Sequence, residues 1–132
     1  MNKNKKLLIF VVEDNLIFQQ LIAKQLDSLS YAIRFFTHGE DCINELKTST
    51  PDVIVLDNSL AGTMSGLDTL KIIRVLHPDL YIVIFSTEKA LDTEENYSSY
   101  GSFVYLEKSI SAFALLREKV GSSEIFLQKT RK

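Results

Sequence analysis

The chain has one cysteine in 132 residues, Cys42, and no apolar run near the roughly 20 residues that span a bilayer. A single thiol forms neither an internal disulfide nor a zinc cluster, which excludes disulfide-rich secreted domains. The apolar part of residues 1–12 covers only six positions, too few for a signal peptide. We therefore expect a cytoplasmic protein with no membrane partner, in which Cys42 is a small buried apolar side chain.

The chain also lacks the glycine-rich patterns G-x-G-x-x-G and G-x-x-x-x-G-K-[ST], which disfavours nucleotide binding. Its formal net charge is only −2, but the basic residues are unevenly placed. Six of the 15 lie in residues 3–6 and 129–132, so residues 7–128 have nine basic side chains against 17 acidic ones, a net charge of −8. This acidic body argues against nucleic acid as a partner of the domain.

Five apolar runs of strand length recur along the chain, and each is followed by a segment with helical spacing. The runs cover residues 7–12, 31–36, 53–56, 81–85 and 103–106. Most of them lack the alternation of a half-exposed strand, which is typical of strands covered on both faces of a parallel sheet. The order predicts an α/β fold, a (βα)5 doubly wound sheet of five parallel strands.

Several helix boundaries have local signals. Thr37 and Glu40 have the spacing of a capping box and predict the start of the second helix. Pro78 predicts the end of the third helix. The fourth helix, within residues 88–100, has few apolar side chains among charged residues and serines, so we expect it to pack loosely.

The domain boundary follows from the last helix. Gly121 and the two serines after it predict the end of the fifth helix. We therefore assign residues 1–121 to one domain and residues 122–132 to a C-terminal tail or the start of a linker.

Polar side chains follow four of the five predicted strands. They are Glu13 and Asp14 after the first, Asp57 and Asn58 after the third, Ser86 and Thr87 after the fourth, and Glu107 and Lys108 after the fifth. The carboxyl ends of parallel strands meet at one edge of the sheet, where such folds bind ligands. Three carboxylates brought together repel one another unless a hard cation and a lysine offset their charge. The pattern predicts a site for Mg²⁺ and an anion.

Asp57 is the expected reacting group, because its strand lies between the acidic pair on one side and Ser86 and Lys108 on the other. Mg²⁺ commonly links protein carboxylates to a phosphoryl group, and a carboxylate can attack phosphorus to form an acyl phosphate. The Lys108 ammonium and the Ser86 hydroxyl would then hold the phosphoryl oxygens in the transition state.

Five motifs, taken together and in this order, resemble those of a known family, the receiver domains of two-component response regulators, which are CheY-like in fold. The motifs are VVEDN, VIVLDNSL, GLDTLKIIR, YIVIFST and YLEKS. Each motif alone would be weak, but the five together are specific, and the resemblance covers about residues 6–120. It implies a flavodoxin/CheY-like sheet with the strand order 2-1-3-4-5.

The resemblance implies that a histidine kinase or a phosphotransfer protein donates a phosphoryl group to Asp57. The metal ligands that it implies are Glu13, Asp14, Asp57 and the backbone carbonyl of Ser59. Such a domain is a regulator and not an enzyme with a separate substrate, because its chemistry is self-phosphotransfer and slow self-dephosphorylation.

The resemblance also implies a conformational switch. Ser86 would move towards the phosphoryl group, and Tyr105 would turn inward behind it. The surface of the fourth helix, the fifth strand and the fifth helix would then change its preference for a downstream protein or an output domain.

Three departures from the family pattern affect this interpretation. Ser109 follows Lys108 where the family usually has a proline joined through a cis bond; a cis bond before serine costs about 2.5–4 kcal/mol, so we expect a trans bond. The loop after Asp57 is one residue longer than usual, with Ala61 where proline is common. Thr87 replaces a smaller residue, and its branch is expected to narrow access for a phosphodonor or water.

Each candidate residue also has a purely structural alternative. Asp57 could simply end a strand, and Glu13 or Asp14 could cap the first helix. Ser86 and Thr87 could form an ordinary turn, and Lys108 could be a solvated surface lysine. Tyr105 could be an ordinary half-buried aromatic residue.

Two other functions compete with the switch. The main alternative is a pseudo-receiver, a protein docking module that works without phosphorylation, and the Lys108–Ser109 junction, Thr87 and the longer loop favour it. The second is a phosphohydrolase with an aspartate nucleophile. Such an enzyme needs a second acid two residues after the nucleophile, and because that position holds Ser59, the sequence disfavours it.

Overall fold

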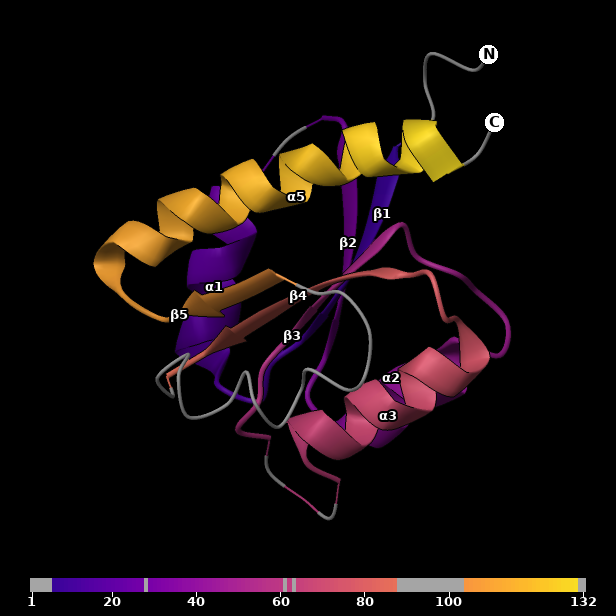
Figure 1. Ribbon diagram of the computed structural model, residues 1–132. Helices are drawn as coiled ribbons and strands as arrows, with labels where there is room; N and C mark the ends of the chain where they lie inside the picture. The colour runs from indigo at the N-terminus through magenta and orange to yellow at the C-terminus, as the bar shows by residue number, and fades with distance from the viewer. Residues whose placement is uncertain (1–5, 28, 61, 63, 88–103, 131–132) are drawn as a thin grey trace.

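The computed structural model describes residues 6–87, except 28, 61 and 63, and residues 104–130; for residues 110 and 123–130 it describes the backbone alone. Five parallel strands form one sheet in the order β2-β1-β3-β4-β5 (Figure 1). The strands are β1 (Leu7–Val12), β2 (Tyr31–Phe36), β3 (Val53–Leu56), β4 (Tyr81–Ser86) and β5 (Val104–Glu107). The helices are α1 (Leu16–Gln25), α2 (Gly39–Glu45), α3 (Gly66–Leu76) and α5 (Ile110–Thr130). The predicted fold class and strand order are confirmed, and the predicted fourth helix at 88–100 lies outside the described residues.

Helices cover both faces of the sheet (Figure 1). On one face, Ile9 and Val55 of the sheet pack in one cluster with Ile22 of α1 and Leu116 of α5. On the other face, buried side chains of the same strands pack against α2 and α3. The central strands are therefore apolar on both sides, which explains why they read as continuous apolar runs.

Cys42 belongs to the cluster on the α2 and α3 face and is fully buried. Burial raises the pKa of its thiol to about 12. The thiol therefore stays protonated near neutral pH, and the prediction that Cys42 acts as a small apolar residue is confirmed.

The parallel register brings the carboxyl ends of the strands to one edge. Val12 pairs with Leu56, Leu56 pairs with Ile84, and Ser86 pairs with Glu107. The residues that follow β1, β3, β4 and β5 therefore start from neighbouring positions.

The predicted capping box at Thr37 and Glu40 is wrong. Helix α2 begins at Gly39 with His38 as its N-cap and without a side-chain cap, and Thr37 Oγ1 lies 3.0 Å from His38 Nδ1 instead. A Cβ atom at Gly39 would overlap the Thr69 hydroxyl on α3. The start of α2 is thus set by its close packing against α3 and not by a local cap.

The predicted end of the last helix at Gly121 is also wrong, because α5 continues to Thr130. One glycine inside a helix costs only about 1 kcal/mol relative to alanine, which does not stop a helix that is otherwise favourable. The Ser122 hydroxyl donates to the carbonyl of Glu118, within the helix. The division into residues 1–121 and 122–132 stays a prediction. Although α5 has 21 residues, no helix in the described part of the chain is apolar enough over its length to cross a membrane.

Helix α3 offers a direct test of the packing. Ile73 is fully buried, whereas Val75 on the same helix is 81% exposed. We expect Ile73→Ala to lower the free energy of unfolding by about 2–5 kcal/mol, because the cavity is lined by close-packed neighbours. Val75→Ala should change it by less than about 0.5 kcal/mol. Urea denaturation followed by circular dichroism measures both, and equal effects would contradict this packing.

Candidate functional site

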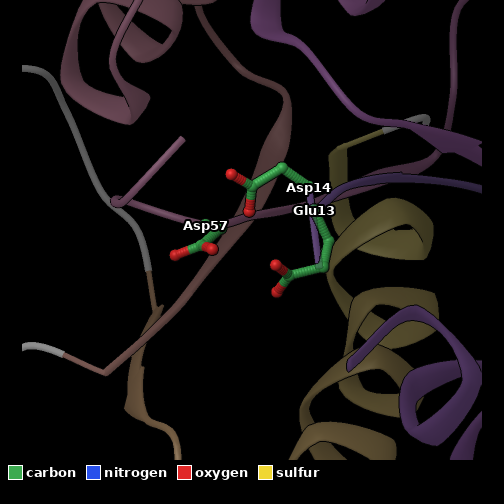
Figure 2. Close-up of side chains that lie close together, drawn as sticks. All are labelled: Glu13, Asp14 and Asp57. Carbon is green, nitrogen blue, oxygen red and sulfur yellow. The ribbon is translucent and has the colours of Figure 1, made fainter. Parts of the chain in front are cut away.

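Three carboxylates converge at the carboxyl edge of the sheet. Glu13 and Asp14 follow β1, and Asp57 follows β3. One carboxylate oxygen from each lies within 4.8 Å of the other two (Figure 2). Glu13 and Asp57 are buried, and Asp14 is half-buried. Hard oxygen donors at this separation fit a divalent cation such as Mg²⁺.

Lys108 reaches into this carboxylate group from the end of β5. Its Nζ donates to Glu13 Oε1 at 2.5 Å and to Asp57 Oδ2 at 3.1 Å, and its side chain is only 4% exposed. The alternative of a solvated surface lysine is therefore wrong. The described residues contain no cis peptide bond, so the expected trans bond between Lys108 and Ser109 is confirmed.

The charge of this group is unbalanced. The pKa of the Glu13 carboxyl is raised to about 7, chiefly by burial and also by the nearby charge of Asp57, while the hydrogen bond from Lys108 acts in the opposite direction. One ammonium group faces three clustered carboxylates. A bound divalent cation would supply the missing positive charge.

Backbone hydrogen bonds fix the position of Asp57. Its N–H donates to the carbonyl of Val12 at 3.0 Å, which ties the residue to the end of β1. The Ser59 N–H donates to Asp57 Oδ1 at 3.0 Å. The backbone of Ser59 thus lies beside the carboxylate, and the role of its carbonyl as a metal ligand stays a prediction.

Helix α3 begins directly against the backbone of Asp57. The N–H of Gly66 donates to the carbonyl of Asn58 at 3.2 Å, and a Cβ atom at Gly66 would overlap the Asp57 carbonyl oxygen. Ser65 and Asp68 form a capping box that starts the helix at this point. Only glycine allows so close an approach. The motif GLDTLKIIR begins with this glycine, but the sequence alone does not show that the Asp57 backbone is the reason for it.

The start of α1 holds the acidic pair in place. Asn15 caps this helix by accepting from the N–H groups of Ile17 and Phe18, so neither acidic side chain is needed as the cap. The Asn15 N–H donates to Glu13 Oε2 at 3.2 Å, and Gln19 Nε2 donates to the Glu13 carbonyl at 2.6 Å. The sequence interpretation missed Gln19, because one glutamine in a polar helix segment has no distinctive signal.

The other residues predicted for the site lie in or directly after β4 and β5. Ser86 is fully buried at the end of β4, and its carbonyl accepts from the Lys108 N–H at 2.6 Å. Thr87 is exposed. Tyr105 is half-buried and packs on the α2 and α3 face of the sheet, and Glu107 is exposed. Their roles at the site stay predictions.

The family pattern described as the response regulator receiver domain matches residues 9–120. The chain therefore belongs to the family of response regulator receiver domains.

The chain is similar to individual members of this family in sequence and in fold. It is 31% identical over 119 residues to the protein-glutamate methylesterase/protein-glutamine glutaminase of Clostridium acetobutylicum, an alignment that covers 87% of this chain and 34% of that protein. The chain thus spans about a third of this relative. The fold is similar to that of the phosphorylated cyanobacterial phytochrome response regulator RcpA, with a TM-score of 0.76 at 24% identity over 95% of this chain and 96% of that one. It is also similar to the Mn²⁺-bound form of the response regulator Rcp1, with a TM-score of 0.74 at 19% identity over 87% and 91% of the two chains.

Gly66→Ala tests whether the site needs the close approach of α3. We expect the free energy of unfolding to fall by about 1–3 kcal/mol, because the added methyl group overlaps the Asp57 backbone. Gly121→Ala is the matched control: its Cβ atom would lie 3.7 Å from the Tyr31 hydroxyl, an ordinary contact, and alanine in a helix should raise stability by up to about 1 kcal/mol. Urea unfolding of both variants measures the difference, and a neutral Gly66→Ala would refute the steric requirement.

Proposed function

We propose that the protein is a phosphorylation-operated receiver that accepts a phosphoryl group on Asp57 from a histidine kinase or a phosphotransfer protein in the cytoplasm. The observation that supports this most strongly is the convergence of Lys108 with Glu13 and Asp57, residues that lie far apart in the sequence. A structural aspartate at a strand end does not require two further carboxylates and a buried lysine around it.

Glu13, Asp14, Asp57 and the backbone carbonyl of Ser59 would hold Mg²⁺. The donor set of three carboxylates within 4.8 Å supports this, as does the described Mn²⁺-bound form of the similar regulator Rcp1. When bound, the cation neutralises negative charge on the carboxylates and on the incoming phosphoryl group.

The side chains of the site then have distinct tasks. An Asp57 carboxylate oxygen attacks the phosphorus atom, and the bond between phosphorus and the donor's histidine nitrogen breaks as the acyl phosphate forms. The electron pair of the broken bond returns to the donor's imidazole. The Lys108 ammonium and the Ser86 hydroxyl hold the phosphoryl oxygens, where a buried positive charge acts more strongly than it would in water.

The product of this reaction is a conformational state. Ser86 moves towards the phosphoryl group and Tyr105 turns inward, while the exposed Thr87 limits the access of donor and water. The surface of β5, α5 and residues 88–100 then changes its affinity for a downstream protein or an output domain. This role is regulatory, and the methylesterase activity named for the clostridial relative belongs to a protein about three times as long.

Intact-mass measurement with acetyl phosphate and Mg²⁺ tests the proposal. Wild-type protein should gain the mass of one phosphoryl group, and Asp57→Asn should gain none, because the amide is not a nucleophile towards phosphorus. Asp52→Asn is the matched control, a buried aspartate at the other end of β3 that accepts the Leu8 N–H, and it should be phosphorylated like wild type. A wild-type protein that never gains this mass would favour the pseudo-receiver instead.

A second experiment separates phosphorylation from switching. We expect Lys108→Ala to accept phosphate but to lose the change in the β5 and α5 surface, because the ammonium no longer pulls on the end of β5. Hydrogen exchange of residues 104–120 with and without acetyl phosphate measures that change, and Lys47→Ala, at an exposed lysine in the turn after α2, serves as the control. A normal change in Lys108→Ala would show that the lysine does not transmit the signal.

A further inference from the structure

The Lys108 ammonium has an aromatic contact in addition to its two carboxylates. Its Nζ lies 4.1 Å from the centre of the Phe18 ring and 5.8 Å from the centre of the Phe85 ring. Both distances are within the roughly 6 Å over which a ring face attracts a cation. The side chain is only 4% exposed, so water screens this attraction little.

We infer that Phe18 is a positioning residue, whose ring face holds the Lys108 ammonium at the phosphorylation site. The inference rests on the proposed function, since the ammonium matters for phosphorylation only if Asp57 accepts phosphate. It adds a residue of α1 whose part in the site the sequence did not indicate.

Competition for the carboxylates makes this contact important. Glu13 and Asp57 hold the ammonium, but they are also the proposed ligands of the divalent cation. A bound cation would draw on the same two carboxylates and would weaken their hold on Lys108. The Phe18 ring offers no oxygen ligand, so a cation would not compete for its contact with the ammonium.

Neighbouring rings hold Phe18 in a fixed orientation. Phe18 of α1 stacks on Phe113 of α5, with ring centres 6.3 Å apart and planes 19° apart. Phe113 meets Phe85 of β4 edge to face at 5.1 Å. Three elements thus support the ring, and the Lys108 N–H is anchored separately on the Ser86 carbonyl. Aromatic pairs prefer defined geometries, so the contacts with Phe113 limit how far the Phe18 ring can tilt away from Lys108.

The ring contact has a spectroscopic signature that does not depend on phosphorylation. Protons above an aromatic ring resonate upfield, so the Cε methylene protons of Lys108 should be shifted upfield in wild-type protein. Phe18→Tyr keeps the ring face and should keep the shift, whereas Phe18→Leu should remove most of it and leave only the smaller contribution of the more distant Phe85 ring. Retention of the full shift in Phe18→Leu would overturn the contact.

The functional arm measures the rate of phosphorylation by acetyl phosphate at saturating Mg²⁺. Phe18→Leu should slow the reaction about threefold to thirtyfold, the range from an exposed to a desolvated cation–π contact, and Phe18→Tyr should keep most of the wild-type rate. Phe36→Leu is the matched control, because Phe36 is also half-buried, packs on another ring and has the Arg34 guanidinium 5.7 Å from its centre. Its backbone carbonyl accepts the Glu13 N–H, a bond that the substitution leaves in place. This control should keep the wild-type rate.

The outcomes separate the inference from the function on which it rests. An unchanged rate in Phe18→Leu, or an equal loss in Phe36→Leu, would overturn the positioning role while leaving phosphorylation intact. A wild-type protein that shows the upfield shift but never accepts phosphate would overturn the proposed function, and the shift would still establish the contact. Amide spectra of all variants verify that each is folded.

Discussion

Lys108 brings one positive charge to the buried carboxylates of Glu13 and Asp57, and the other features of the site depend on this ion pairing. Burial of an unpaired carboxylate is costly, and loss of one partner from a buried pair leaves an uncompensated charge. Even with Lys108 present, burial keeps the pKa of Glu13 near 7. Three carboxylates around one ammonium leave a deficit of positive charge, and a divalent cation would offset it.

The parallel sheet brings this group of side chains together, because the carboxyl ends of its strands share one edge. Four strands deliver polar residues there, while the apolar strands beneath them are covered by helices on both faces. Glycine at position 66 then lets α3 begin in contact with the backbone of Asp57. Asp57 is thus held between β1 and α3, with the Ser59 N–H bonding to its carboxylate and the Val12 carbonyl to its backbone N–H.

Strand β5 connects the site with both helical layers. Leu106 packs on the α1 and α5 face, Tyr105 packs on the α2 and α3 face, and Lys108 follows at the end of the strand. The rings of Phe18 and Phe113 extend the contact from Lys108 to helix α5. A movement of Lys108 would therefore act through direct contacts on β5 and α5, which belong to the surface that we propose as the switch.

The sequence alone predicted the five strands to within one residue in the described part, and it predicted the acidic edge, because strand patterns and strand-end polar residues are local signals. Tertiary structure decided what depends on contacts across the fold. Thr37 failed as a cap because α2 packs against α3, and Gly121 did not end α5. The partners of Lys108 lie 51 and 95 residues away along the chain, so only folding could show that its ammonium is buried between two carboxylates and against the ring of Phe18.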